Sequence, residues 1–166
     1  MKVRYASHCS YRIRYHMVFV LKYRKDLISD LVFSELKDIL EGISFRYHLS
    51  FQAVGTDKNH LHLLVESAPR YSPSKVMQIC KSVTAVQLFK RIPELKDILW
   101  GGHFWSEGGH IDTVGDGYDV KQMAEYILNQ GVSRKQVTLT SFSSTDVDDY
   151  IYFQDMFFEN IFPKFL

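Results

Sequence analysis

The sequence predicts an α+β domain with a ferredoxin-like or RRM-like antiparallel sheet of split βαβ order and helices on one face. Two observations support this class. Segments with alternating apolar residues and segments with helical periodicity follow one another in the order β-α-β-β-α-β. Gly, Pro, Asn and Asp separate these segments, as they do in turns. A further C-terminal helix, which carries Tyr126, follows the last strand.

The first predicted strand runs from Tyr11 to Lys22 and separates two kinds of side chain. One face suits a core and holds Tyr11, Ile13, Tyr15, Met17, Phe19 and Leu21. The opposite face begins with Arg12, Arg14 and His16. Such a face suits a phosphate backbone, whose contacts give affinity without reading base sequence. The strand alone is equally consistent with an exposed sheet face that arginine keeps soluble.

A helix and a hairpin are predicted next. Apolar residues recur at helical spacing from about Asp30 to Tyr47, and Ser29 or Asp30 is the expected N-cap. A second strand, Leu49 to Thr56, then reaches the third through turn residues that end at Asn59.

The third predicted strand, Asn59 to Glu66, carries the functional interpretation. Leu61, Leu63 and Val65 point to one face, and His60 and His62 point to the other. Side chains two residues apart on a strand lie side by side, so both imidazoles can reach one metal ion. The alternative is a half-buried strand whose histidines satisfy local hydrogen bonds.

The remaining elements complete the sheet. Ser72 as N-cap and Pro73 at the first helical position start a second helix, which carries Lys81 and ends at Pro93. A further strand, or a hairpin around Gly108-Gly109, is expected between Leu99 and Val114. Asp119 is the expected N-cap of a helix to about Gln130.

The element order makes the first and third strands central neighbours. If the helices cover the Leu61 face, the two histidines emerge on the same face as Arg12, Arg14 and His16. The expected consequence is a surface where a metal site and basic groups converge.

Two spaced motifs resemble one known family. The histidine–hydrophobic–histidine (HUH) motif His60-Leu61-His62 and the later Tyr126-Ile127-x-x-Gln130 resemble the single-tyrosine HUH transposases of small insertion sequences, TnpA-like proteins that move single-stranded DNA. The segments YHMVFVLKYRKD and FWSEGGHIDTVGD fit the same family. The resemblance covers Tyr11 to Gln130.

The resemblance implies a mechanism. Tyr126 is expected to attack a phosphodiester, giving a 5′-phosphotyrosine and a free 3′-OH. His60 and His62, with the carbonyl oxygen of Gln130 as a third ligand, are expected to bind Mg²⁺ or Mn²⁺. The expected partners are single-stranded DNA hairpins at element ends and a second subunit, in a homodimer that shares its active sites. The chain departs from the family at Glu107, where the resemblance implies a basic or aromatic residue before the glycine. A carboxylate at this position would repel phosphate.

Charge is distributed unevenly along the chain. From Met1 to Arg91 there are 15 Lys and Arg against 7 Asp and Glu, and from Ile92 to Leu166 there are 5 against 12. Either a polyanion partner or two mutually attracting faces explains this split. The expected DNA contacts are Arg12, Arg14, His16, Lys22, Arg24, Lys58 and Lys81.

Length and composition suit one catalytic domain, residues 1–142, followed by an acidic and aromatic tail, residues 143–166. The tail is expected to pack on its own domain or the partner subunit; alternatively, it mimics DNA over the basic surface. No apolar segment approaches the roughly 20 residues of a membrane span, and the first residues lack a signal peptide, so a cytoplasmic protein is expected. Cys9 and Cys80 suggest neither a disulfide framework nor a metal site.

Other classes fit less well. A zinc nucleobase deaminase needs H-x-E and P-C-x-x-C, and the sequence has neither. Replication initiators and relaxases share the HUH motif, but this chain is small and Tyr126 is its one well-placed tyrosine. The remaining alternative is a non-catalytic, RRM-like module that binds nucleic-acid hairpins by stacking and charge. The first strand has no clear match to the aromatic RNP pattern of such modules.

Overall fold

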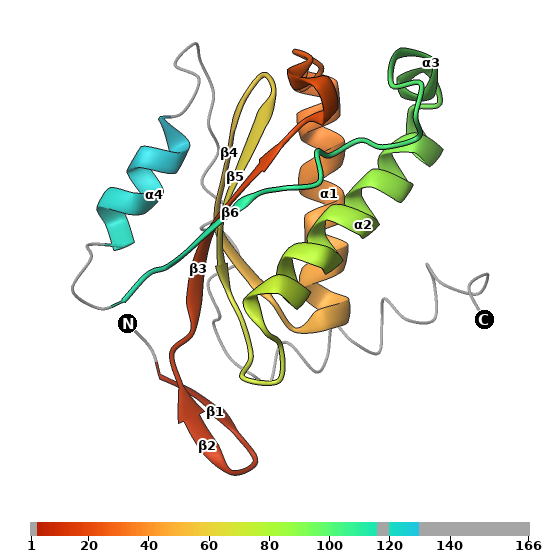
Figure 1. Cartoon of the computed structure of the whole chain (residues 1–166). Helices are drawn as coiled ribbons and strands as arrows, with labels where there is room; N and C mark the ends of the chain where they lie inside the picture. The colour runs from red at the N-terminus through yellow and green to blue at the C-terminus, as the bar shows by residue number, and fades with distance from the viewer. Residues whose placement is uncertain (1–2, 116–119, 130–166) are drawn as a thin grey trace.

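A four-stranded antiparallel sheet forms the centre of the chain (Figure 1). The computed structural model describes residues 3–115 and 120–129. The strand order is β4-β5-β3-β6, with bounds β3 (Arg14–Val20), β4 (Ser50–Asp57), β5 (His60–Glu66) and β6 (His110–Thr113). The predicted split βαβ order and the central pairing of the first and third predicted strands are therefore confirmed.

Two long helices, α1 (Asp30–Tyr47) and α2 (Pro73–Arg91), cover one face of this sheet (Figure 1). Ser29 and Ser72 cap them, because each hydroxyl accepts a hydrogen bond from the backbone N–H three residues later. The main core lies between the sheet and these helices. Its fully buried members include Met17, Phe19, Leu36, Leu40, Leu61 and Leu63.

A small hairpin, which was not expected from the sequence, precedes the sheet. Its strands are β1 (Arg4–Ala6) and β2 (Cys9–Tyr11), which pair with each other. The expected strand from Tyr11 is therefore interrupted, and β3 begins only at Arg14. Alternation of side chains continues through the break, so the period alone could not locate it.

The segment between α2 and β6 also differs from the prediction. Beyond Pro93 the chain forms a short helix, α3 (Glu94–Ile98), and no hairpin forms around Gly108-Gly109. Instead β6 pairs with the edge of β3, and Trp105 forms an isolated bridge with Leu21. The open edge of β3 supplies the backbone partners that a local hairpin would have provided.

The last described helix, α4 (Val120–Leu128), lies on the face of the sheet opposite α1 and α2 (Figure 1). It closes a second, smaller core formed by Ala53, Leu64, Val114 and Ile127. Gln130 and the predicted tail, residues 143–166, lie outside the described residues. Among the helices of the described part, none has the length and hydropathy needed to cross a membrane.

Candidate active site

Two histidines of β5 share the sheet face that α4 covers in part. The ring centroids of His60 and His62 are 6.5 Å apart. His62 is buried and His60 partly buried, and the Thr56 hydroxyl donates a hydrogen bond to the His60 carbonyl oxygen across the β4–β5 hairpin. Burial, with smaller contributions from His16 and His60, lowers the pKa of His62 to about 4. A neutral imidazole is the form that binds metal ions.

His16 of β3 joins these two residues from the neighbouring strand. Its Nε2 lies 3.5 Å from Nδ1 of His62, and the two rings are stacked with their planes 15° apart. His16 is buried, which lowers its pKa, while nearby Asp112 opposes that shift. His16 lies on the predicted face, but it was expected to be part of an exposed DNA-binding surface. A buried ring in contact with His62 instead belongs to the site itself.

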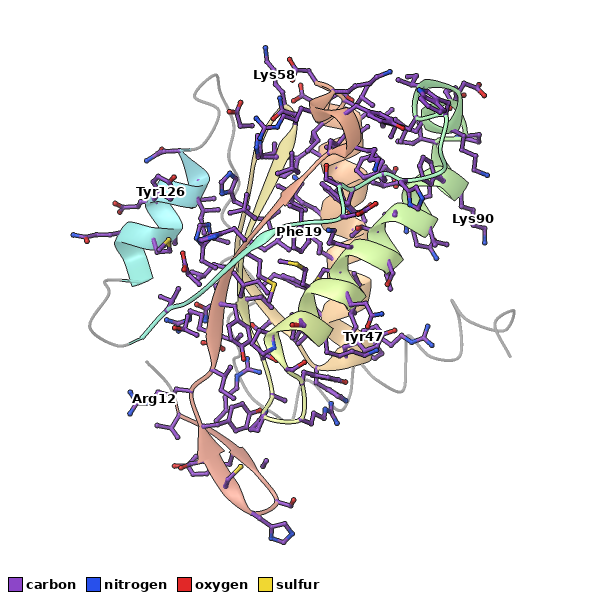
Figure 2. All side chains as sticks on the ribbon, viewed as in Figure 1. Arg12, Phe19, Tyr47, Lys58, Lys90 and Tyr126 are labelled. Carbon is purple, nitrogen blue, oxygen red and sulfur yellow. The ribbon has the colours of Figure 1, made fainter. Side chains whose placement is uncertain are left out.

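Tyr126 lies on α4 (Figure 2) and contacts the same cluster through His16. Its ring meets the His16 ring edge-on, with centroids 6.4 Å apart, and the residue remains 54 % exposed. Ile127, the next residue, is fully buried against the sheet. Gly55 permits this packing, because a Cβ there would overlap the carbonyl oxygen of Ile127. Small residues on β4 thus bring an accessible phenol beside the histidines of its own chain.

The metal-ligating side chains at this site suit a divalent metal ion that retains open coordination positions. His60 and His62 offer two imidazoles on one face, and no group of three or more His, Cys, Asp or Glu that could hold a metal occurs in residues 3–115 and 120–129. Gln130, the expected third ligand, lies outside those residues. Two protein nitrogens leave coordination positions for phosphate oxygens and water, so the described residues fit a divalent metal ion.

An edge-strand pair beside His16 was not predicted as part of the site. His110 and Asp112 of β6 contact each other, with 2.6 Å between Nε2 and Oδ2, and both are exposed. Asp112 lies opposite His16 in the β3–β6 register. A strand or a hairpin was expected in this part of the chain, but neither side chain was among the expected site residues. Successive side chains of a strand point to opposite faces, so the strand pattern of residues 110–114 already places His110 and Asp112 on one face.

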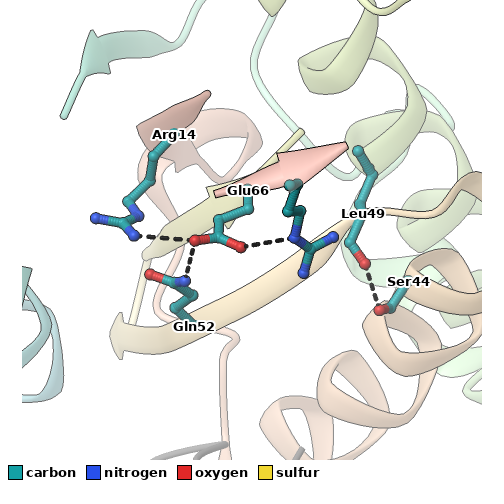
Figure 3. Close-up of polar contacts among 6 residues, drawn as sticks. Arg14, Ser44, Leu49, Gln52 and Glu66 are labelled. Carbon is teal, nitrogen blue, oxygen red and sulfur yellow. Dashed lines mark hydrogen bonds and ion pairs between the residues drawn. The ribbon is translucent and has the colours of Figure 1, made fainter. Parts of the chain in front are cut away.

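Arg14 does not have the role that the sequence analysis gave it. Its guanidinium is buried and forms an ion pair with Glu66, with 2.9 Å between Nη2 and Oε1 (Figure 3). Gln52 donates to the same carboxylate, and Arg4 forms a further ion pair with it at 3.2 Å. Arg14 is therefore a buried structural residue and not an exposed phosphate contact. Glu66 therefore orients this basic group within the domain.

Lys81, which was expected to contact DNA, binds backbone carbonyl groups of its own chain instead. Its Nζ donates to the carbonyl oxygens of Ser106, Glu107 and Gly108, and burial lowers its pKa. It lies on α2, which covers the face of the sheet opposite the histidines and α4 (Figure 1). The ammonium stabilises the segment that leads into β6.

The other expected DNA contacts lie nearer the surface. Arg12, Arg24 and Lys58 are exposed and Lys22 is partly exposed. Lys58 is in the β4–β5 turn (Figure 2), directly before the strand that carries the histidines.

The fold and the site together define a small α+β protein with an HUH strand at the centre of its sheet and a tyrosine helix facing it. Known proteins share this plan. The family described as IS200-like transposases matches residues 9–130. The ISDra2 transposase TnpA of Deinococcus radiodurans is 31 % identical over 120 residues, which cover 72 % of this chain and 85 % of that protein. The IS200 transposase of Salmonella typhimurium is 26 % identical over 124 residues, covering 75 % of this chain and 80 % of that protein.

Solved structures agree with these sequence matches. A crystal structure of a Deinococcus radiodurans protein assigned as a transposase has a TM-score of 0.63 at 28 % identity, covering 78 % of this chain and 99 % of that one. A REP-associated tyrosine transposase bound to a REP hairpin has a TM-score of 0.51 at 11 % identity, covering 75 % and 71 %, and bears on the fold alone. The chain belongs to the IS200-like transposase family and is a transposase that acts on DNA.

Proposed function

We propose that this transposase cleaves and rejoins single-stranded DNA by attack of Tyr126 on a phosphodiester. The observation that carries the proposal is the meeting of Tyr126, His16 and His62 on one face of the sheet. An exposed phenol is a nucleophile, and the neighbouring histidine pair can hold a cation at the same phosphate.

The proposed step exchanges one ester for another. The Tyr126 oxygen forms a bond to phosphorus while the bond from phosphorus to the 3′-oxygen breaks. The phenolic proton passes to water, and the departing 3′-oxygen takes up a proton to become a 3′-OH. The product is a 5′-phosphotyrosine, which keeps a phosphodiester bond, so a 3′-OH can reverse the attack and join strands without ATP.

His60 and His62 would hold a divalent ion, Mg²⁺ or Mn²⁺, which polarises the scissile phosphate and offsets its charge. Gln130 as a third ligand rests on the family resemblance. The unshifted pKa of a tyrosine in water is about 10, so the phenol needs such help at neutral pH.

The proposed partners are single-stranded DNA with hairpins and a second copy of the chain. One solved structure of the same fold is described as bound to a REP hairpin. The hairpin partner proposed for this chain rests on the family resemblance. Exposed cations next to the histidine strand, Lys58 among them, are suited to the phosphate backbone. A homodimer with shared sites follows from the family resemblance.

The test is a covalent adduct on labelled single strands. Each oligonucleotide of a hairpin library is labelled at either its 5′ or its 3′ end and incubated with the protein and Mn²⁺, then denatured. A 5′-phosphotyrosine retains the fragment on the 3′ side of the break. The 3′ label should therefore shift with the protein, while the 5′ label should leave on a free 3′-OH strand.

Two variants complete this test. Tyr126→Phe should give no adduct, whereas Tyr5→Phe, which changes an exposed tyrosine on the distant β1–β2 hairpin, should behave as wild type. If hairpins bind but neither label ever shifts with wild-type protein, the non-catalytic binding module is the correct alternative.

A further inference from the structure

Two exposed aromatic side chains stack on each other at one end of the sheet. The rings of Tyr23 and Trp100 have centroids 5.8 Å apart and planes only 12° apart. Tyr23 is 46 % exposed and Trp100 is 76 % exposed. Trp is usually buried on most of its surface, and exposed apolar surface of this kind often marks a binding site. The main core and the candidate active site use neither ring.

Backbone conformation and a hydrogen bond hold the segments that carry this pair in place. Tyr23 lies in the short 3₁₀ segment η1 (Lys22–Arg24), where Tyr23 and Arg24 have φ angles of 61° and 50°. Residues other than Gly rarely adopt the left-handed region, and when they do the position is often functional. Lys25 Nζ donates to the carbonyl oxygen of Ile98 at 2.9 Å, which ties this turn to the segment that carries Trp100.

Positive charge lies next to the stacked rings. The Lys22 ammonium is 5.6 Å from the centroid of the Tyr23 ring, and Arg24 is exposed directly after it. The backbone of Lys58 joins the same end, because its carbonyl oxygen accepts a hydrogen bond from the Ile28 N–H. Aromatic faces flanked by cations are the combination that holds bases and phosphates of single strands.

The pair also lies at the end of the sheet where the histidine strand begins. Val20 is the register partner of His60, and the Leu21 N–H donates to the Asn59 carbonyl oxygen. Tyr23 follows Val20 by three residues, so its backbone is at most about 11 Å further along the chain. A strand held at the histidines can therefore extend over this end of the sheet.

We propose that Tyr23 and Trp100 form a stacking platform for an unpaired base of the DNA strand next to the scissile phosphate. This proposal rests on the proposed function, because it assumes single-stranded DNA at the histidine site. The platform recognises the flat face of a base and no particular base edge. Lys22 and Arg24 bind the phosphates on either side of that base.

The experiment measures binding to strands that have or lack bases. Fluorescein-labelled hairpins carry six thymidines on each side, or six abasic residues on each side, and fluorescence anisotropy gives their affinity. The Tyr126→Phe protein is used, so that cleavage plays no part. Because one base stacked on an aromatic ring contributes a factor of about 5 to 150 in affinity, the abasic hairpin should bind more weakly by that factor.

The variant Trp100→Ala, in the same background, should bind the thymidine hairpin more weakly than the parent protein by that factor. It should bind the abasic hairpin with the same affinity as the parent. Trp100→Phe should retain most of the affinity, and Tyr5→Ala should match the parent protein because Tyr5 is exposed but lies on the β1–β2 hairpin. Quenching of Trp100 fluorescence by the thymidine hairpin checks the contact without any substitution, since Trp105 is buried.

Equal affinity for thymidine and abasic flanks, or unchanged binding by a folded Trp100→Ala protein, would overturn the platform. Binding that depends on bases while wild-type protein never forms an adduct would support the platform and reject the proposed cleavage. An adduct from wild type without any dependence on bases would do the opposite.

Discussion

His62 and His16 contact each other through their ring nitrogens, with Nδ1 of His62 3.5 Å from Nε2 of His16. Their stacked rings come from adjacent strands and are both buried. If His62 carries its proton on Nδ1, that proton points at His16 and the Nε2 lone pair is free for a metal ion. His16 then acts as a positioning residue for a ligand, as partners of metal-binding histidines commonly do.

Replacing His16 should therefore weaken metal binding. His16→Phe fills the space but removes the nitrogen, and the affinity for Mn²⁺ should fall by about 10- to 100-fold, as is typical for such partners. Calorimetry or Mn²⁺ electron paramagnetic resonance measures it without DNA. His16→Gln keeps a polar partner and should recover part of the loss. Wild-type affinity in a folded His16→Phe protein would contradict the positioning role.

The histidine pair itself should separate cleavage from binding. His60→Ala or His62→Ala should abolish adduct formation in Mg²⁺, because each removes one of the two proposed metal ligands, while hairpin affinity stays within a few-fold. Adduct assays and fluorescence anisotropy measure the two properties side by side. Normal cleavage rates in both variants would exclude a metal site at these residues.

Gly55 should be essential for the position of the tyrosine helix. In Gly55→Ala the new Cβ overlaps the Ile127 carbonyl oxygen, so α4 must shift and adduct formation should fall at least 10-fold, in line with about 10²-fold for a misplacement near 1 Å. Gly42→Ala is the matched control, because its Cβ meets nothing within 4 Å on α1. That change should raise the free energy of unfolding by about 0.4–1 kcal/mol. Full activity in Gly55→Ala would show that α4 does not need this contact.

Mixed subunits test whether active sites are shared. In the single chain the described part of α4 packs on its own sheet through a small core, and exchange with a second copy would reproduce the same contacts. His60→Ala and Tyr126→Phe chains are each expected to be inactive. After exchange about half the dimers are mixed, and with shared sites roughly a quarter of all sites should recover. Verified heterodimers without activity would place each site within one chain.

The two cysteines should react very differently with thiol reagents. Cys9 is exposed, whereas Cys80 is fully buried on α2 and burial raises the pKa of its thiol to about 12. Because the thiolate is the reactive form, a colorimetric thiol reagent at pH 8 should modify one cysteine in the native protein and two after unfolding. Rapid modification of Cys80 under native conditions would indicate that α2 opens locally.

Local patterns in the sequence determined the architecture and the centre of the site. Alternation along β3 and β5 assigned the core face, and helical spacing with Ser29 and Ser72 located α1 and α2. These features are predictable because side-chain direction and capping depend on neighbours a few residues apart. The histidine pair on one strand face follows from the same local rule.

Only the tertiary structure decided what the charged and aromatic side chains do. Arg14 and Glu66 are 52 residues apart, and the carbonyl groups that Lys81 binds are 25 to 27 residues away. A cation in a sequence suits phosphate, a carboxylate or a carbonyl oxygen equally well, so its partner is settled only when the chain brings distant strands together. The stacking of Tyr23 on Trp100 and the approach of Tyr126 to His16 depend on the same long-range packing, which no local period records.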